Sequence, residues 1–163
     1  MSALPRDCPG LLQDARLPLI VSSLKRLTGR QLLARGADPV QGLWLASAAI
    51  VAHGIQADPV FFFGNRTALD LFETTPGAFA VLPSRLSAEP GLRAERAVLM
   101  ARVARDGYTD AYSGVRISAK GRRFRIRQAT VWNLLDEEGA VHGQAAMFAH
   151  WTLLGDAPPG AGF

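Results

Sequence analysis

The sequence has very few of the side chains that form crosslinks or hold metal ions, with one cysteine and three histidines among 163 residues. Because Cys8 is alone, no intramolecular disulfide can form, and the chain suits a reducing compartment. His142 and His150 fall on one predicted strand about 26 Å apart, which is too far for them to share an ion. We therefore expect no metal site.

A long apolar segment is also missing. The longest apolar run, Leu43 to Ala52, is shorter than the about 20 residues that a membrane-spanning helix needs. Charge and proline interrupt the N-terminus, unlike a secretion signal. The basic excess is mild, with 18 Lys and Arg against 14 Asp and Glu. We expect a cytoplasmic protein without membrane contact, folded as one ordinary globular domain.

Sequence motifs for catalysis and for nucleotide binding are absent as well. The residues around Ser113 do not match G-x-S-x-G, and the glycines nearby lack the spacing of a phosphate-binding loop. The acidic segment 136–138 lies in a predicted hairpin turn, where solvation explains it better than acid–base work. No helix-turn-helix, zinc-finger or RNA-binding signature occurs. We expect no enzyme, name no catalytic residue, and do not expect a nucleic-acid partner.

The N-terminal part predicts a flexible arm followed by an extension helix. Residues 1–16 combine Pro, Gly and Asp without a period. Pro18 suits the first turn of a helix, after which apolar side chains recur at helical spacing in Ile20, Leu24 and Leu27. Gly36 lies where such a helix would stop, so the predicted extension helix spans 17–36.

The next segments predict a second short helix, a hairpin and a capped helix. Asp38 and Pro39 form an N-cap and first-turn pair for a helix that ends near Ser47. Residues 48–65 are typical of a β-hairpin, with an Asp-Pro turn between two apolar strands. Asn65 follows the second strand, and we expect it to cap the next helix rather than to contact a ligand.

The last part predicts one long helix and a three-stranded antiparallel meander. Residues 92–105 form the helix, and Arg96 falls on its apolar stripe, so we expect its guanidinium to reach water or to find a carboxylate. The turn sequences "AKG" and "DEEG" separate three β-rich runs, 109–118, 122–135 and 141–154. We expect residues 155–163 to form a flexible tail.

The middle run of this meander alternates in character. One predicted face holds Phe124, Ile126, Thr130 and Trp132, and the other holds Arg123, Arg125 and Arg127. Cationic side chains on a strand normally lie in water and oppose aggregation. We therefore interpret the arginines as a solvated face rather than as a patch that binds phosphates.

Several stretches, in order along the chain, resemble one family. The segment "HGIQADPVFFFGNRTALDLFE" (53–73) is similar to the opening of a PAS domain. More narrowly, the sequence resembles the MEKHLA family in "LPSRLSAE" (82–89), "YSGVRIS" (112–118), "GRRFRI" (121–126), "VWNLLDEEG" (131–139) and "HGQAAMFAHW" (142–151). The resemblance covers roughly 17–154. It implies an α+β, PAS-like fold, in which a five-stranded antiparallel sheet carries helices on one face beside the N-terminal extension helix.

The family is known as a stand-alone bacterial protein and at the C-terminus of plant homeodomain-leucine-zipper transcription factors, and it is described as sensory by analogy with PAS domains. The resemblance thus implies a non-enzymatic sensory or small-molecule-binding module that acts through a partner protein. The alternative is an interaction module without a ligand, in which the helix with Ile20, Leu24 and Leu27 pairs with a second copy of the chain.

The cup of a PAS-like fold also implies where a ligand would bind. Side chains from the concave face of the sheet, with one from the loop before the long helix, give the candidate contacts Tyr112, Arg116, Trp132, Gln144, Phe124 and Arg85. A buried arginine among such groups suits a small ligand with a carboxylate on an apolar body. Alternatively, these polar groups satisfy one another in the core.

The sequence names no cofactor. Light-sensing PAS relatives that form a covalent adduct need a cysteine at the pocket, and Cys8 precedes the predicted fold, so a covalent chromophore is disfavoured while non-covalent flavin stays open. Haem-binding PAS relatives commonly take the iron ligand from the long helix, which has no histidine here. His53 is the remaining, remote alternative for haem.

Overall fold

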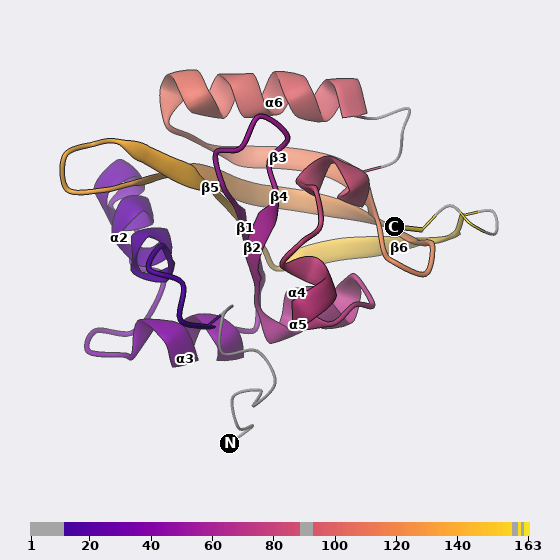
Figure 1. Cartoon of the computed structure of the whole chain (residues 1–163), viewed down its shortest axis with the longest axis horizontal. Coiled ribbons are helices and arrows are strands. Elements are labelled where there is room, and N and C mark those ends of the chain that lie inside the picture. Colours follow the sequence, from indigo (N-terminus) through magenta and orange to yellow (C-terminus); the bar gives the residue numbers. More distant parts are fainter. Residues whose placement is uncertain (1–11, 89–92, 158–159, 161) are drawn as a thin grey trace.

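Short helices surround one antiparallel sheet in the computed structural model of the chain, which describes residues 12–88, 93–157, 160 and 162–163 (Figure 1). The helices are α2 (Leu17–Thr28), α3 (Pro39–Leu45), α4 (Arg66–Leu71), α5 (Pro76–Phe79), a 3-10 turn (Ser84–Ser87) and α6 (Arg93–Asp106). The strands are β1 (Ala49–His53), β2 (Phe61–Gly64), β3 (Tyr108–Ile117), β4 (Arg122–Leu135), β5 (Val141–Phe148) and β6 (His150–Asp156). None of the helices in the described ranges is long and apolar enough to cross a membrane.

The sheet has the strand order β2-β1-β5-β4-β3, and β6 also pairs with β4. β5 pairs with the half of β4 from Thr130 to Leu135, whereas β6 pairs with the half from Arg122 to Arg127. β5 and β6 therefore act as one long strand that is interrupted at Ala149. This arrangement confirms the predicted meander and the five-stranded antiparallel sheet, with the last predicted strand divided in two.

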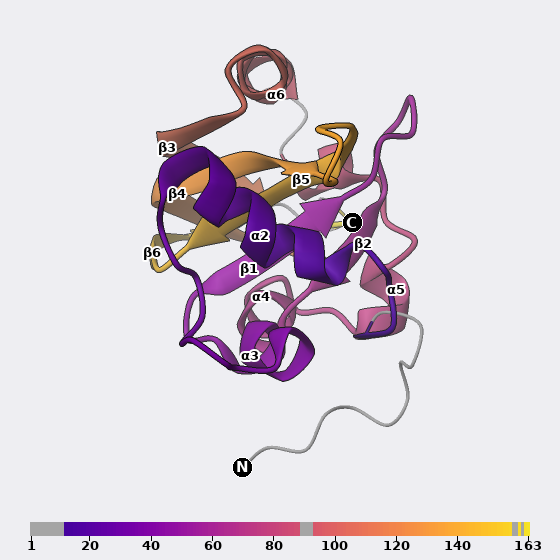
Figure 2. The same ribbon diagram turned by 90° about the vertical axis from the view of Figure 1, so that its left-hand side faces the viewer.

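Helices α2 and α6 lie on opposite faces of this sheet. Val131 and Trp132 are neighbours on β4, so their side chains point to opposite sides. Val131 packs against Leu99 and Val103 of α6. The indole Nε1–H of Trp132 instead donates to the carbonyl of Ile20 in α2, at 3.1 Å. Figure 2 shows α2 crossing in front of the strands while α6 lies above them.

A β-bulge at Gln128 changes the predicted alternation along β4. Gln128 has φ +52°, and the register with β3 shifts at this point, where Tyr112 pairs with Ala129 and Gly114 with Ile126. The extra residue moves the following side chains to the other face. The prediction that Thr130 and Trp132 share a face with Phe124 and Ile126 is therefore wrong: Ala129 and Val131 continue that face.

The extension helix is shorter than predicted. α2 ends at Thr28, because Gly29 adopts the left-handed conformation with φ +77° and its N–H donates to the carbonyl of Lys25, at 2.8 Å. Its apolar stripe packs on the chain's own sheet, where Ile20 and Leu24 are fully buried. In this structure the stripe is thus not a free surface for a second copy, contrary to the alternative hypothesis.

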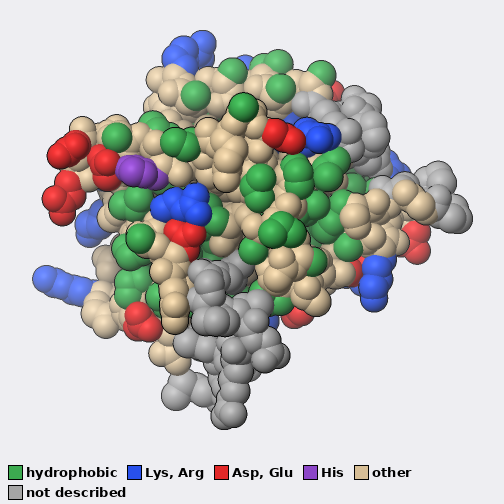
Figure 3. All heavy atoms as spheres, in the orientation of Figure 1, with side chains coloured by type: hydrophobic (Ala, Val, Ile, Leu, Met, Phe, Trp, Pro, Cys, Tyr) green, Lys and Arg blue, Asp and Glu red, His purple; other side chains and the backbone are tan. Residues whose placement is uncertain are grey.

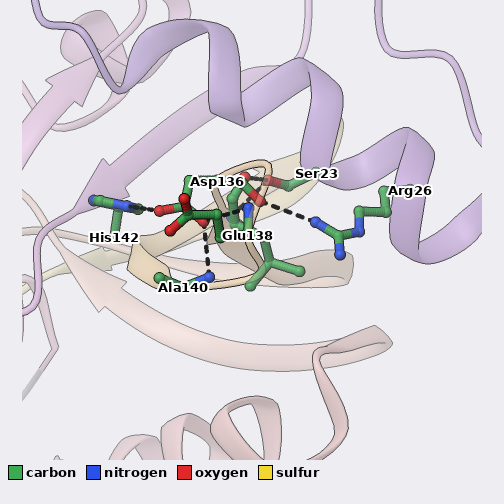
Figure 4. Close-up of polar contacts among 7 residues, drawn as sticks. Ser23, Arg26, Asp136, Glu138, Ala140 and His142 are labelled. Carbon is green, nitrogen blue, oxygen red and sulfur yellow. Dashed lines mark hydrogen bonds and ion pairs between the residues drawn. The ribbon is translucent and has the colours of Figure 1, made fainter.

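Polar contacts fasten α2 to the turn between β4 and β5 (Figure 4). The hydroxyl of Ser23 accepts from the N–H of Leu135 at 2.7 Å, and Arg26 donates to the carbonyl of Asp136 at 3.0 Å. The carboxylate of Asp136 shapes the turn by accepting from two backbone N–H groups of that turn. Its hydrogen bond with His142, 2.7 Å long, lowers the pKa of Asp136.

The other predicted elements are confirmed with small changes of boundary. Asp38 caps α3, which supplies Leu43 and Trp44 to the core, and α6 begins and ends within a residue of its predicted limits. The first predicted residue of that helix, Leu92, lies outside the described residues. At the C-terminus β6 continues to Asp156, so the predicted tail began too early.

The arginine-rich strand is solvated as expected. Arg125 and Arg127 are exposed, and Arg122 forms an ion pair with Glu73 at 2.8 Å. On the face shown in Figure 3, basic side chains are scattered among acidic ones instead of forming a continuous patch.

Asn65 is fully buried and joins four segments. Its side-chain oxygen accepts from the N–H groups of Ile50 and Ala68, both at 3.0 Å, so it caps α4 as predicted. Its amide nitrogen donates to the carbonyls of Leu43 (3.1 Å) and Ala48 (2.8 Å). One side chain thereby links the end of α3, the start of β1, the end of β2 and the start of α4.

We predict that Asn65→Asp lowers the free energy of unfolding by about 3 kcal/mol, because a carboxylate cannot donate to the carbonyls that surround the amide nitrogen. Urea denaturation measures the change. Thr75→Ala is the matched control, since exposed Thr75 caps α5 through a single bond to Ala78 and its loss costs about 1 kcal/mol or less. Equal costs for both variants would contradict the role of Asn65.

Candidate ligand-binding cavity

A cavity lies between the sheet and α6. Its walls come from β1, β3, β4, β5 and α6, with Phe61 from β2 and Phe72 from the end of α4. The space that the centre of a water-sized sphere can occupy is about 40 Å³, several times the about 10–15 Å³ that one water molecule needs. The cavity therefore has room for a compact group.

Most of the lining is apolar. The apolar lining residues include Phe61, Phe72, Met100, Ile126 and Val131. The bulge at Gln128 places the second half of β4 in this wall, because it turns Val131 toward α6. Such a surface suits the hydrocarbon part of a ligand.

Two arginines from different elements face this apolar space. Arg96 comes from α6, and Arg116, which is 8% exposed, comes from β3. Arg116 donates to the carbonyl of Val115 at 3.3 Å, and its guanidinium lies 5.3 Å from the ring centre of Tyr112. The Nε of Arg96 is buried and has no hydrogen-bond partner. In the part of the chain that the structure describes, no carboxylate forms an ion pair with either arginine.

The surroundings of Arg96 disfavour its charged form. Burial lowers the pKa of Arg96 to about 10, and the charge of Arg116 lowers it further in the same direction. Arg96 still carries its proton at neutral pH, so the cavity is lined by two positive charges, that of buried Arg116 and that of half-buried Arg96. Arg96 lines the cavity and is half-buried, so part of the side chain still reaches water, which was one of the two expected alternatives; no carboxylate partner is found among the described residues.

His53 and Gln144 add hydrogen-bond acceptors to the cavity. They are cross-strand neighbours on β1 and β5. Burial lowers the pKa of His53 to about 4, and the charge of Arg96 acts in the same direction, so His53 is neutral at pH 7. Its Nδ1 lies 2.9 Å from the carbonyl of Gly54, which requires the proton on Nδ1 and leaves Nε2 as an acceptor.

A chain of hydrogen bonds determines how Gln144 is oriented. The amide nitrogen of Asn133 donates to the carbonyl of Val103, at 3.1 Å, so its oxygen must be the atom that faces Gln144. That oxygen accepts from the amide nitrogen of Gln144, also at 3.1 Å. The side-chain oxygen of Gln144 is then left as a buried acceptor without a partner.

The structure brings together half of the predicted contacts. Tyr112, Arg116 and Gln144 line the cavity. Phe124 is not among the lining residues, although its ring lies 5.2 Å from that of Phe72, which does line the cavity. Trp132 is on the opposite face of the sheet, because of the bulge, and so does not line the cavity.

Arg85 is not at the rim either, since it forms a surface ion pair with Asp58 at 3.1 Å. Two polar residues that line the cavity were not among the predicted contacts: Arg96, which was placed only on the apolar stripe of its helix, and His53, which was named only as a remote haem ligand. The available signal for Arg96 was a charged residue on an apolar helical stripe. Among the described residues there is no group of three or more His, Cys, Asp or Glu that could hold a metal ion.

The comparisons with known proteins identify relatives along most of the chain. The sequence model of the MEKHLA domain matches residues 15–153. Homeobox-leucine zipper protein ATHB-14 of Arabidopsis thaliana is 33% identical over 131 residues, which are 78% of this chain and 15% of that protein. Homeobox-leucine zipper protein ATHB-9 of the same plant is 26% identical over 161 residues, or 90% of this chain and 19% of that protein. The chain thus spans less than a fifth of these relatives.

Solved structures show the same fold at low sequence identity. The PAS domain of a protein from Colwellia psychrerythraea aligns with a TM-score of 0.57 at 14% identity, over 66% of this chain and 89% of that domain. The blue-light photoreceptor Vivid aligns with a TM-score of 0.57 at 14% identity, over 80% of this chain and 94% of that structure. A light-oxygen-voltage domain studied with a flavin analogue aligns with a TM-score of 0.57 at 16% identity, over 74% of this chain and 87% of that structure. The expected PAS-like fold is confirmed.

We predict that Arg96→Met stabilises the ligand-free protein by about 1 kcal/mol, because it removes one of two like charges at the cavity together with a buried, unpaired Nε donor, and keeps an apolar stem. Chemical denaturation of the ligand-free protein measures the change. Arg102→Met, at an exposed position of the same helix, should alter stability by less than about 0.5 kcal/mol. A loss of stability in Arg96→Met would show that Arg96 supports the fold instead.

We also predict that His53 makes stability depend on pH. The unfolded chain binds a proton below pH 6.5 that folded His53, with a pKa of about 4, does not bind, so up to roughly 3 kcal/mol is lost as the pH falls from 6.5 to 4. His53→Gln should remove this part of the slope, measured by denaturation at a series of pH values. His150→Gln, at an exposed position, should keep it, and an unchanged slope in His53→Gln would contradict the assignment.

Proposed function

The chain belongs to the MEKHLA domain family, and from this premise we propose that it is a non-enzymatic sensory module that binds a small organic molecule in the cavity between the sheet and α6. One observation is decisive for this proposal. Four buried side-chain nitrogen or oxygen atoms of the described residues have no hydrogen-bond partner, and three of them, on His53, Arg96 and Gln144, belong to residues that line this cavity.

Unsatisfied buried polar atoms cost free energy, so their concentration in one place needs a cause. Each unpaired donor or acceptor costs about 1–3 kcal/mol, and a buried cation without a counter-charge costs more. A bound ligand that pairs with these atoms offsets the cost. Natural proteins accept such local destabilisation mainly where it serves a function.

The same cavity supports binding better than catalysis. Its serine hydroxyl, that of Ser87, donates to the carbonyl of Ser84 at 2.7 Å and is not held by a base. The neutral imidazole of His53 is fixed by Gly54 on one side and has no described nucleophile hydrogen-bonded to the other. We therefore assign no catalytic residue.

The position of α6 gives the ligand a means to change the outer surface. α6 packs on the sheet through a small apolar cluster of Leu99, Val103 and Val131, separate from the main core. Arg96 of α6 and Arg116 of β3 repel each other when the cavity holds no anion. A ligand between them favours a different position of α6 from the empty state, and a partner protein that contacts α6 responds to the shift.

A covalent flavin adduct has no attachment point in this cavity. No cysteine is among the lining residues, whereas light-sensing PAS relatives that form such an adduct need one at the pocket. The resemblance to light-oxygen-voltage domains therefore supports the shared fold and not a covalent chromophore.

The proposal is tested by native mass spectrometry of the protein purified from its own host. We expect a retained small molecule that is released on denaturation. Met100→Trp, which fills the cavity from α6, should lose it, whereas Val98→Trp, at an exposed position of the same helix, should retain it. The proposal fails if neither the purified protein nor the protein exposed to a host metabolite extract holds any molecule in a manner sensitive to Met100→Trp.

A further inference from the structure

We propose that the ligand is a compact hydroxy acid. Its carboxylate binds between Arg96 and Arg116, and its hydroxyl donates to the acceptors His53 and Gln144. This inference rests on the proposed function, because it specifies the ligand of the same cavity. It follows from the pairing needs of the polar atoms described above.

The two arginines require an anionic group. Both arginines line the cavity, the Nε of Arg96 is a buried donor without a partner, and neither arginine has a carboxylate partner among the described residues. A carboxylate has two oxygens, so it can accept from one arginine on α6 and from one on β3 at once. Apolar walls surround this position, which favours an organic acid over inorganic phosphate, whose further oxygens would remain unpaired.

The two acceptors require a donor on the ligand. The Nε2 of His53 and the side-chain oxygen of Gln144 are both buried and unpaired. They cannot satisfy each other, because both are acceptors in the orientations set by Gly54 and Asn133. An ammonium or guanidinium group of the ligand would be repelled here by the charge of Arg96, whereas a neutral hydroxyl of the ligand can donate without that repulsion.

The body of the ligand must be small and apolar. Phe61, Phe72, Ile126 and Val131 line the same cavity as the polar groups. One aromatic ring or a short aliphatic chain presents enough apolar surface to contact these side chains. Hydroxybenzoates combine all three features and are therefore suitable probes.

Isothermal titration calorimetry with the full chain tests the proposed chemistry. The probes are benzoate, the 2-, 3- and 4-hydroxybenzoates, phenol, inorganic phosphate and riboflavin. We expect at least one hydroxybenzoate to bind, benzoate to bind three- to tenfold more weakly, and phenol, phosphate and riboflavin to show no binding. The isomer that binds best reports the spacing between the two polar ends.

Variants separate the two ends of the ligand. Arg96→Gln and Arg116→Gln should each weaken benzoate and the best hydroxybenzoate alike, by tenfold to a hundredfold. Gln144→Met should lower the affinity for the hydroxybenzoate to that for benzoate and should leave the affinity for benzoate unchanged. Arg125→Gln and Gln31→Met, at exposed positions, are matched controls that should bind like the original chain, and circular dichroism verifies that each variant is folded.

The outcomes distinguish this inference from the proposed function. If phenol, riboflavin or a molecule retained from the host binds in the cavity and both arginine variants bind it unchanged, the hydroxy acid is overturned while the proposed function stands. If hydroxybenzoates bind no more tightly than benzoate, the role of His53 and Gln144 is overturned. If no probe binds and no molecule is retained from the host, both proposals are wrong.

Discussion

The buried side-chain amide of Asn65 is the contact on which the arrangement of the first half of the fold depends. It is hydrogen-bonded to the end of α3, to β1 and to the start of α4. β1 and β2 provide His53 and Phe61 to the cavity, and α4 is followed by Phe72. A buried amide loses hydrogen bonds if any of these segments moves. This half of the cavity therefore has a single defined position.

The polar side chains of the cavity, unlike that of Asn65, are not all hydrogen-bonded. Asn65 and Asn133 are buried and hydrogen-bonded, whereas Arg96, His53 and Gln144 retain unpaired buried atoms. A core that needed only stability would have apolar side chains at these positions, because an unpaired buried charge destabilises the fold. Within one domain, this contrast marks the cavity as the place where unpaired polar atoms lower stability. The unpaired atoms indicate which donors and acceptors the proposed ligand would need.

The two helices on the sheet have different attachments and therefore different roles. α2 is held by the indole of Trp132, by Ser23 and by fully buried Ile20 and Leu24. α6 is held by a small apolar cluster and by the hydrogen bond from Asn133 to Val103, and it brings the charge of Arg96 near that of Arg116. Elements with few buried contacts are the ones that move at low cost. We therefore propose α6 as the element that a ligand would move, with α2 as a fixed cover.

The sequence by itself determined the strand order of the meander, the caps at Asp38 and Asn65, and the solvated arginines, because these depend on local periodicity and turn chemistry. It also brought together Tyr112, Arg116 and Gln144. Only the tertiary structure decided which side of the sheet each later residue of β4 faces, since one extra residue at Gln128 reverses the alternation. The proximity of Arg96 and Arg116, which are far apart in the sequence, likewise depended on how α6 packs across the strands.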